Sequence, residues 1–144
     1  MAVAVDGEAI VRRWIEEVLN KGNLTVVDKL FAPEFVNLTD RNQPHGPEGV
    51  RQGVTQLRSA FPDLQVNLED VFAHEDRVAW LYTCRGTHKG EFGGVAPTGR
   101  AVEFQGIVMG RLAGGRLTQG RGIVDSVALL QQLGQLVPGP APAG

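Results

Sequence analysis

The sequence predicts an α+β domain in which helices from the first part of the chain pack on one face of a strongly curved antiparallel sheet from the second part. Up to residue 61, apolar residues recur with the 3.6-residue period of amphipathic helices, and from residue 64 they alternate with a period of two. The connections between strands at 73–76 and 113–115 are short. They require antiparallel neighbours, because a parallel crossover needs about a dozen residues or more.

The first part of the chain contains signals for three helices. Asp6 is a suitable N-cap for the first helix, and the basic, glycine-containing stretch 21–23 ends it. A short second helix follows and ends before Pro33. The third helix begins at Pro47, because proline suits the first turn of a helix, and it ends before Pro62.

Four strands and a final helix are expected after residue 64. A first short strand is followed by three longer ones, which span 77–86, 101–112 and 116–125. Glycine inside a strand commonly marks a bend or bulge, and the last two strands contain four such residues, Gly106, Gly110, Gly120 and Gly122. A sheet curved in this way and closed by helices on its concave side encloses a conical, barrel-like cavity that suits a small apolar ligand.

Composition and length limit the classes of protein to which this chain can belong. The chain has 144 residues, and we expect one domain over 1–137 and a disordered tail of proline, glycine and alanine over 138–144. With 42% hydrophobic residues, 21% charged residues and a net charge of -2, the chain has no basic excess that would attract nucleic acid or a membrane. A single cysteine, the lack of a signal-like apolar start and the lack of a long apolar run favour a cytoplasmic location.

Several common chemistries lack their residue patterns here. Ser59 and Ser126 are the only serines, and neither lies in a nucleophile elbow. The glycine clusters match neither a phosphate loop nor a dinucleotide fingerprint. His45, His74 and His88 lack the close spacing of zinc ligands. We therefore expect no cofactor and no metal.

Asp125 is the main candidate for a catalytic residue, and two roles are open to it. It directly precedes the leucine-rich helical pattern "SVALLQQL", so it can cap that helix, a role worth about 1 kcal/mol. Alternatively, its carboxyl group points into the apolar cavity. Desolvation would then raise the pKa of Asp125 towards neutrality, where the group can both accept and return a proton.

The alternation of side chains along a strand extends this hypothesis to neighbouring residues. If Asp125 faces the cavity, Ile123, Arg121 and Gln119 face it too, and the long side chain of Arg121 can reach a substrate oxygen. Otherwise, Arg121 is a partly solvated residue at a subunit contact. Gln105 is a second candidate for stabilising oxyanion charge, because it is a polar residue in the middle of an otherwise apolar strand.

Aromatic residues are candidates for the wall of the substrate cavity. Trp80 and Tyr82 share one strand face, and Trp14 and Phe35 come from the helical part of the chain. These side chains either shape the pocket or belong to ordinary core or interface packing. His88, just past the end of a strand, is either a substrate contact or a loop histidine that binds a backbone carbonyl.

Three stretches of the sequence, "GPEGVRQGVTQLRSAFPDLQV", "DRVAWLYTCRGTHKGEFGGVAPTGR" and "VDSVALLQQLG", resemble the SnoaL-like polyketide cyclase family of the nuclear transport factor two superfold. The resemblance covers roughly residues 8–134. It implies a conical α+β fold, assembly into a homodimer or larger homo-oligomer, and cofactor-free ring closure of polyketide esters by intramolecular aldol condensation. It also places Asp125 at the position of the family's general acid/base.

The chain departs from the family pattern around this aspartate. The cyclases pair the aspartate with a histidine on the preceding strand, but residues 89–144 contain no histidine. Arg121 and Gln119 stand where relatives often have tryptophan and glutamate, and Leu38 stands where many have histidine. The resemblance therefore implies the family fold with an altered pocket.

These observations predict a cofactor-independent enzyme that closes a ring in a largely apolar, carbonyl-bearing metabolite such as a polyketide intermediate. Asp125 is the expected acid/base, and Arg121 or Gln105 the expected oxyanion partner. Two alternatives remain. The first is epoxide opening of the limonene epoxide hydrolase type, with a set formed by Asp125, Arg121 and Glu103. The second is a non-catalytic ligand-binding domain, in which Asp125 only caps the last helix.

Overall fold

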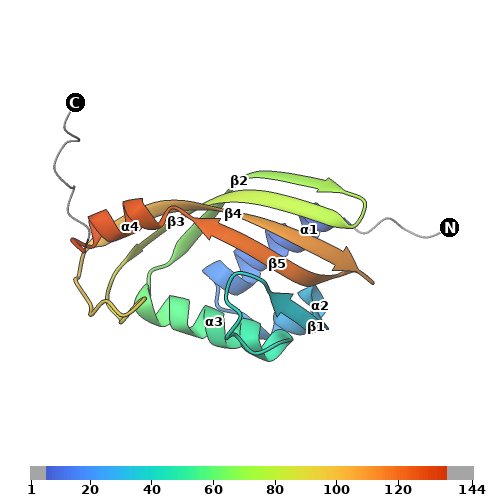
Figure 1. The fold of residues 1–144 in the computed structure, drawn as a ribbon, viewed down its shortest axis with the longest axis horizontal. Coiled ribbons are helices and arrows are strands. Elements are labelled where there is room, and N and C mark those ends of the chain that lie inside the picture. Colours follow the sequence, from blue (N-terminus) through green and yellow to red (C-terminus); the bar gives the residue numbers. More distant parts are fainter. Residues whose placement is uncertain (1–5, 136–144) are drawn as a thin grey trace.

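In the computed structural model, which describes residues 6–135, helices cover one face of a five-stranded sheet (Figure 1). The strand order is β1-β5-β4-β3-β2. The predicted α+β fold is therefore confirmed. In chain order the elements are α1 (Gly7–Arg13), η1 (Trp14–Asn20), η2 (Leu24–Val26), α2 (Val27–Leu30), β1 (Phe31–Asn37), α3 (Pro47–Ala60), β2 (Gln65–His74), β3 (Arg77–Thr87), β4 (Ala101–Ala113), β5 (Arg116–Val124) and α4 (Ser126–Gln132).

The first helix forms and ends as its sequence predicts, and a side chain in its last turn fixes it to the sheet. The carboxylate of Asp6 accepts a hydrogen bond from the backbone N–H of Ala9, which caps α1. The helix continues into the wider turns of η1. There, Asn20 donates to the backbone carbonyl of Val66 on β2 (2.9 Å) and accepts from its N–H (2.7 Å).

The segment after the second helix differs from the prediction, because it adds a parallel strand to the sheet. The helix ends at Leu30, and β1 then pairs with β5 in parallel, with Phe31 opposite Leu117 and Asn37 opposite Gly120. The sheet is therefore mixed and not purely antiparallel. Pro33 is tolerated in this strand because β1 lies at the edge of the sheet, where one side of the backbone needs no partner.

Strands β2 to β5 form the expected antiparallel meander. The turn between β4 and β5 consists of Gly114 and Gly115, which have φ angles of 59° and 79°. A two-residue turn of type I′ requires positive φ at both positions, and glycine adopts it without steric cost. This turn fixes the register of β5 on β4 and therefore decides which side chains of β5 face the helices.

The sheet curves over the helices, and apolar side chains of its concave face form the core together with them (Figure 1). Two glycines of β4 are needed for this packing. A side chain at Gly106 would collide with the hydroxyl group of Tyr82, and one at Gly110 with Leu117. The strand glycines therefore make room for large inward-facing neighbours.

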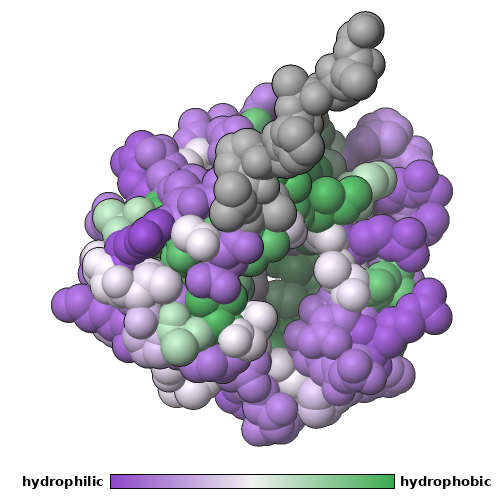
Figure 2. Space-filling model, turned by 60° about the vertical axis from the view of Figure 1, so that its left-hand side comes forward, coloured by the Kyte–Doolittle hydropathy of each residue, from purple (hydrophilic) through white to green (hydrophobic). Residues whose placement is uncertain are grey.

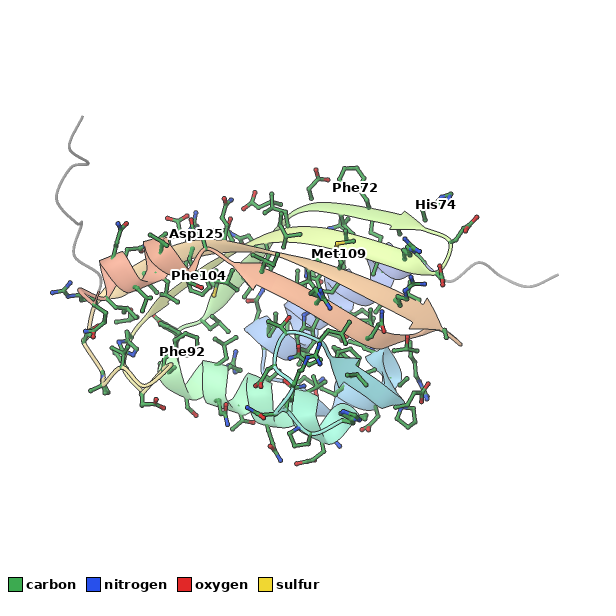
Figure 3. The ribbon with its side chains drawn as sticks, in the orientation of Figure 1. Phe72, His74, Phe92, Phe104, Met109 and Asp125 are labelled. Carbon is green, nitrogen blue, oxygen red and sulfur yellow. The ribbon has the colours of Figure 1, made fainter. Side chains whose placement is uncertain are left out.

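The convex face of the sheet is left open by the helices of residues 6–135, apart from the short α4 near one end (Figure 1). Figure 3 shows Phe72, His74 and Met109 on this side of the sheet, away from α3. The face exposes several large apolar side chains, namely Phe72 (70% exposed), Ile107 (51%), Met109 (62%) and Ile123 (75%). We call these four residues the outer apolar patch.

Two remaining expectations concern the ends of the chain and the membrane. The tail at 138–144, which the sequence predicts to be disordered, lies outside the described residues. Among residues 6–135, no helix has both the length and the apolar character needed to cross a membrane.

The packing of Tyr82 predicts an unusual titration. Tyr82 is the only tyrosine of the chain, and burial raises its pKa to about 12 from an ordinary value of 10.0. In a spectrophotometric titration of the folded protein, tyrosinate absorbance should appear with a midpoint near pH 12. In the urea-unfolded chain the midpoint should lie near pH 10.

The same shift links the free energy of unfolding to pH. Because the folded state holds the Tyr82 proton more tightly, the stabilisation is fully present below about pH 10 and is lost as the pH rises towards about 12. Circular dichroism recorded at each pH shows whether the chain is still folded. A tyrosinate midpoint near pH 10 in a chain with native circular dichroism would contradict the buried position.

Candidate ligand-binding cavity

A cavity of about 300 Å³ lies between α3 and the concave face of the sheet. One wall is a face of α3, where Val50, Val54 and Leu57 follow one another at helical spacing. The opposite wall comes from β3, β4 and β5 and includes Trp80, Val108 and Val124. Figure 2 shows a hollow lined by hydrophobic residues and surrounded by hydrophilic ones.

Aromatic side chains form the end of the cavity near the first helices. Trp14 packs edge-to-face on Phe31 with ring centroids 4.9 Å apart, and Phe31 packs in the same way on Phe35 at 4.8 Å. All three residues line the cavity, as does Trp80. The structure thus places the predicted wall residues Trp14, Phe35 and Trp80 together around one space.

Asp125 does not line this cavity. Its carboxylate accepts a hydrogen bond from the backbone N–H of Ala128 at 3.1 Å and caps α4, and its side chain is exposed. Figure 3 shows Asp125 at the start of α4, on the side of the sheet away from α3. Of the two roles that the sequence left open, the structure contains the capping arrangement, and the predicted orientation into the cavity is contradicted.

The faces of β5 are the reverse of those assumed for a catalytic Asp125. Gly120, Gly122 and Val124 line the cavity, whereas Arg121 and Ile123 point to the convex face and are exposed. Arg121 and Ile123 therefore lie outside the lining of this cavity, on the face opposite to the predicted one. A physical reason is desolvation: an arginine without a partner would lose its hydration in an apolar cavity.

Gln119 is the exception among the residues expected on that face. It borders the cavity as well as the convex face, where it pairs opposite Arg111 on the same side of β5 as Arg121. The register shift between Arg111 and Leu112 turns Leu117, and not Gln119, to the inner face. A bulge of this kind changes the alternation of side chains beyond it.

Gln105 and Glu103 also lie on the convex face. The side-chain amide of Gln105 donates to the hydroxyl group of Thr83 at 3.3 Å, and Glu103 forms an ion pair with Arg85 at 3.0 Å. Neither residue lines the cavity. The predicted oxyanion role of Gln105 and the epoxide-opening set with Glu103 are therefore not supported by the positions of these side chains.

Tyr82 and His88 face the interior but do not reach the cavity. Tyr82 lies over Gly106 and fills space in the core. His88 is fully buried, and its Nδ1 accepts a hydrogen bond from the backbone N–H of Thr98 at 3.2 Å. Its ring lies 5.7 Å from that of Phe61. His88 therefore holds the connection between β3 and β4 in place and lies outside the lining of the cavity.

The polar side chains that do line the cavity are all neutral. None of the described lining residues carries an ionisable side chain; the polar ones are Trp14, Asn37, Thr39, Gln43, Trp80 and Gln119. Within residues 6–135 no group of three or more histidine, cysteine, aspartate or glutamate residues is placed to bind a metal ion. The cavity therefore offers hydrogen bonds but no proton donor or acceptor that titrates near neutral pH.

Three of these polar residues lie on β1 and the segment that follows it, and hydrogen bonds hold that segment on the sheet. The hydroxyl group of Thr39 accepts from the backbone N–H of Gly122 (2.6 Å) and donates to its carbonyl (3.1 Å). The Asn37 carbonyl oxygen accepts from the N–H groups of Thr39 (2.9 Å) and Asp40 (3.2 Å), and its amide donates to Gln43 (2.9 Å).

No sequence pattern singles out Asn37, Thr39 and Gln43 as cavity residues. They are single polar residues in a stretch without periodicity, and such residues usually belong to a solvated loop. The asparagine at the end of the strand, followed by a threonine and an aspartate, is an Asx-turn signal, but it does not reveal the cavity beside it.

Comparison with known proteins agrees with this fold. The family model for SnoaL-like polyketide cyclase matches residues 9–133. The aklanonic acid methyl ester cyclase DauD of Streptomyces sp. (strain C5) is 29% identical over 141 residues, which cover 94% of this chain and 84% of that protein. The aklanonic acid methyl ester cyclase AcmA of Streptomyces galilaeus is 30% identical over 135 residues, covering 90% and 92%.

A solved structure supports the fold independently. TsrD from Streptomyces laurentii superposes with a TM-score of 0.85, covering 90% of this chain and 95% of that chain at 23% sequence identity. At this level of identity the likeness shows the fold alone. With a family model that spans nearly all of the described residues, relatives named as cyclases and a shared open mixed sheet, this chain belongs to the SnoaL-like polyketide cyclase family.

Proposed function

We propose that this protein binds a largely apolar, carbonyl-bearing compound of the polyketide type and promotes its intramolecular aldol ring closure without an ionisable catalytic side chain. The observation that supports this proposal most directly is the lining of the cavity, which combines apolar walls with neutral hydrogen-bonding groups. A volume of about 300 Å³ lies at the lower end of the range for small-molecule sites. The relatives named as cyclases of aklanonic acid methyl ester support the class of reaction.

The chemistry needs the cavity to fold the substrate and to stabilise its enolate. Water at the mouth removes a proton from a carbon atom next to a carbonyl group. The resulting enolate carbon bonds to the carbonyl carbon at the other end of the substrate. The hydronium ion formed in the first step then protonates the new alkoxide. The product is an isomer of the substrate, so no oxidant or other reactant is needed. The cavity contributes by positioning both ends and by donating hydrogen bonds to the enolate oxygen.

This proposal assigns a structural role to Asp125. A general acid or base typically contributes about 10²–10⁴ in rate, but it must lie within hydrogen-bonding reach of the proton that it moves. Asp125 is exposed, outside the cavity lining, and bonded to the backbone of α4. To act on a ligand in the cavity, it would have to break the cap and enter an apolar space.

A second candidate function is ligand binding without catalysis. The neutral lining favours it, because the described lining residues include no group that could exchange a proton with substrate near neutral pH. The two functions differ in whether the bound compound is converted, so one assay separates them.

Turnover of aklanonic acid methyl ester tests the proposal, because that compound is named in the activities of the relatives. We expect the wild-type protein to convert it to a product of unchanged mass and altered chromatographic retention. Binding without conversion would favour the second candidate. Absence of both binding and conversion for this ester would contradict the proposed substrate class.

A variant that fills the cavity tests whether the ligand binds there. A Cβ atom at Gly122 would meet no atom closer than 3.5 Å, so Gly122→Leu extends into the cavity without a backbone collision. We expect at least tenfold weaker binding and turnover with an unchanged thermal midpoint. The control is Ile123→Leu, because it places the same side chain one residue further on, where it faces the convex side. Equal loss in both variants would exclude the cavity as the cause.

Substitution of Asp125 separates capping from acid/base catalysis. Asparagine also caps helices, so Asp125→Asn should leave both the thermal midpoint and turnover unchanged. Asp125→Ala should lower the free energy of unfolding by about 1 kcal/mol while turnover at a permissive temperature persists. A loss of turnover of about 10²-fold in Asp125→Asn, with an unchanged thermal midpoint, would instead show that Asp125 acts as an acid/base.

We further propose that the outer apolar patch is the contact between two copies of this chain. Leu81, Ile107 and Ile123 lie opposite one another in one row across β3, β4 and β5. A two-fold axis along this row would pair these apolar residues with their own copies. Arg121 and Asp125 lie two residues on either side of Ile123, so Arg121 would face Asp125 of the partner subunit. Two-fold contacts of this kind are self-complementary.

Charge reversal tests this contact. Arg121→Glu would place two carboxylates against each other across the two-fold axis, and we expect the mass measured by light scattering to fall to that of the monomer. The combined variant Arg121→Glu/Asp125→Arg should restore the larger mass. Arg116→Glu, at the exposed start of the same strand, is the control and should leave the assembly unchanged. A monomeric wild-type protein at micromolar concentration would refute the proposal.

A further inference from the structure

The hydrogen bonds around Asn37 fix the orientation of the side-chain amide of Gln43. The backbone N–H groups of Thr39 and Asp40 both point at one end of the Asn37 side chain. Backbone N–H groups only donate, so this end must be the carbonyl oxygen. The other end is therefore the NH2 group, which donates to Gln43 at 2.9 Å. The Gln43 atom that receives this bond must in turn be its oxygen.

The NH2 group of Gln43 is left available to a ligand. Gln43 lines the cavity, and no described residue accepts a hydrogen bond from its Nε2 atom. The side chain lies against the glycines of α3: a Cβ atom at Gly49 would be 3.0 Å from its Cγ, and one at Gly53 would be 3.6 Å from its Oε1. A side chain at Gly49 would collide first with the backbone carbonyl of Pro44, whereas a Cβ atom at Gly53 would be in ordinary van der Waals contact with the Gln43 amide.

The segment that carries Gln43 is held at both ends. Thr39 exchanges two hydrogen bonds with the backbone of Gly122, and the N–H of Gly46 donates to the carbonyl of Phe35 at 2.8 Å. Pre-organisation matters here, because a donor that is already in place loses little conformational entropy when a ligand binds.

From this geometry we propose that Gln43 Nε2 donates a hydrogen bond to a carbonyl or enolate oxygen of the ligand. Asn37 is the positioning residue, because it fixes which end of the Gln43 amide faces the ligand. The inference rests on the proposed function and adds the group that recognises the substrate oxygen. A donor of this kind binds the enolate more strongly than the neutral ketone, because hydrogen bonds to charged acceptors are stronger. A neutral amide also keeps this property at every pH at which the protein is folded.

Asn37→Asp is the sharpest test, because it should turn the Gln43 side-chain amide around without removing it. The new carboxylate can still accept from the N–H groups of Thr39 and Asp40, so the turn is retained. It cannot donate to Gln43. The Gln43 amide should therefore rotate, give its NH2 group to the carboxylate and present its carbonyl oxygen to the cavity.

The probe is 1-phenylbutane-1,3-dione, a small apolar diketone whose enolate has its own ultraviolet absorption. We expect the wild-type protein to lower the apparent pKa of the bound diketone relative to the free compound. In Asn37→Asp and in Gln43→Leu, the affinity for the enolate should fall by about 10-fold to 100-fold, and the affinity for the neutral form should change much less.

Two controls make the outcome decisive. Asn42→Asp adds the same charge at an exposed position of the same segment, so it measures the long-range effect of a carboxylate alone and should behave as the wild type does. Thermal midpoints verify folding, and if Asn37→Asp fails to fold, Gln43→Leu decides. Equal enolate affinity in all variants would overturn the role of Gln43 while leaving the proposed function intact. Failure of the wild-type protein to bind the diketone and aklanonic acid methyl ester would overturn both.

Discussion

The alternation of side chains along β5 determines which residues line the cavity and which form the convex face. Because successive residues of a strand point to opposite faces, the short run from Gly120 to Val124 gives the cavity two glycines and a valine, and gives the convex face Arg121 and Ile123. The two-glycine turn at Gly114 and Gly115 and the register shift near Leu117 fix this arrangement. A shift by one residue would put the arginine into the cavity and the glycines outside.

This alternation explains why the cavity is neutral. The inward positions of the last two strands are occupied by glycines and apolar residues, and the charged residues of the same strands lie on the other face. Burial of an isolated charge in such a space would cost far more than a hydrogen bond returns. Recognition is therefore left to amides, indoles and a hydroxyl group, which keep the same charge across the pH range of the folded protein.

Family membership and chemistry depend on different parts of this protein. Membership of the SnoaL-like polyketide cyclase family rests on nearly the whole described chain, and relatives named as cyclases share about 29% of its residues. The chemistry depends on a much smaller set of positions, and a fold can host different chemistries when these change. The segment from Asn37 to Gln43 supplies three of the polar groups in this cavity, and Thr39 fixes it directly to β5.

Elements whose signals are local follow from the amino-acid sequence alone. Asp6 before an apolar helical pattern, Pro47 at the start of α3 and the paired glycines of the last hairpin act through contacts a few residues apart, so the helices and the antiparallel meander could be predicted. The capping bond of Asp125 is equally local, since it reaches only to Ala128, but the sequence left this role open beside the catalytic one. The aromatic wall of Trp14, Phe35 and Trp80 was also visible as a set of candidates.

Features that depend on pairing between distant segments could not be predicted in this way. The parallel strand β1 pairs with β5 across some 80 intervening residues, so no local pattern predicts this pairing. The face that β5 turns to the helices depends on the register of the whole sheet, and for this reason local alternation alone predicts the wrong side for Arg121 and Ile123. Gln43 became a candidate only when the fold brought its segment against Gly122 and α3, because hydrogen bonds between remote residues leave no period in a sequence.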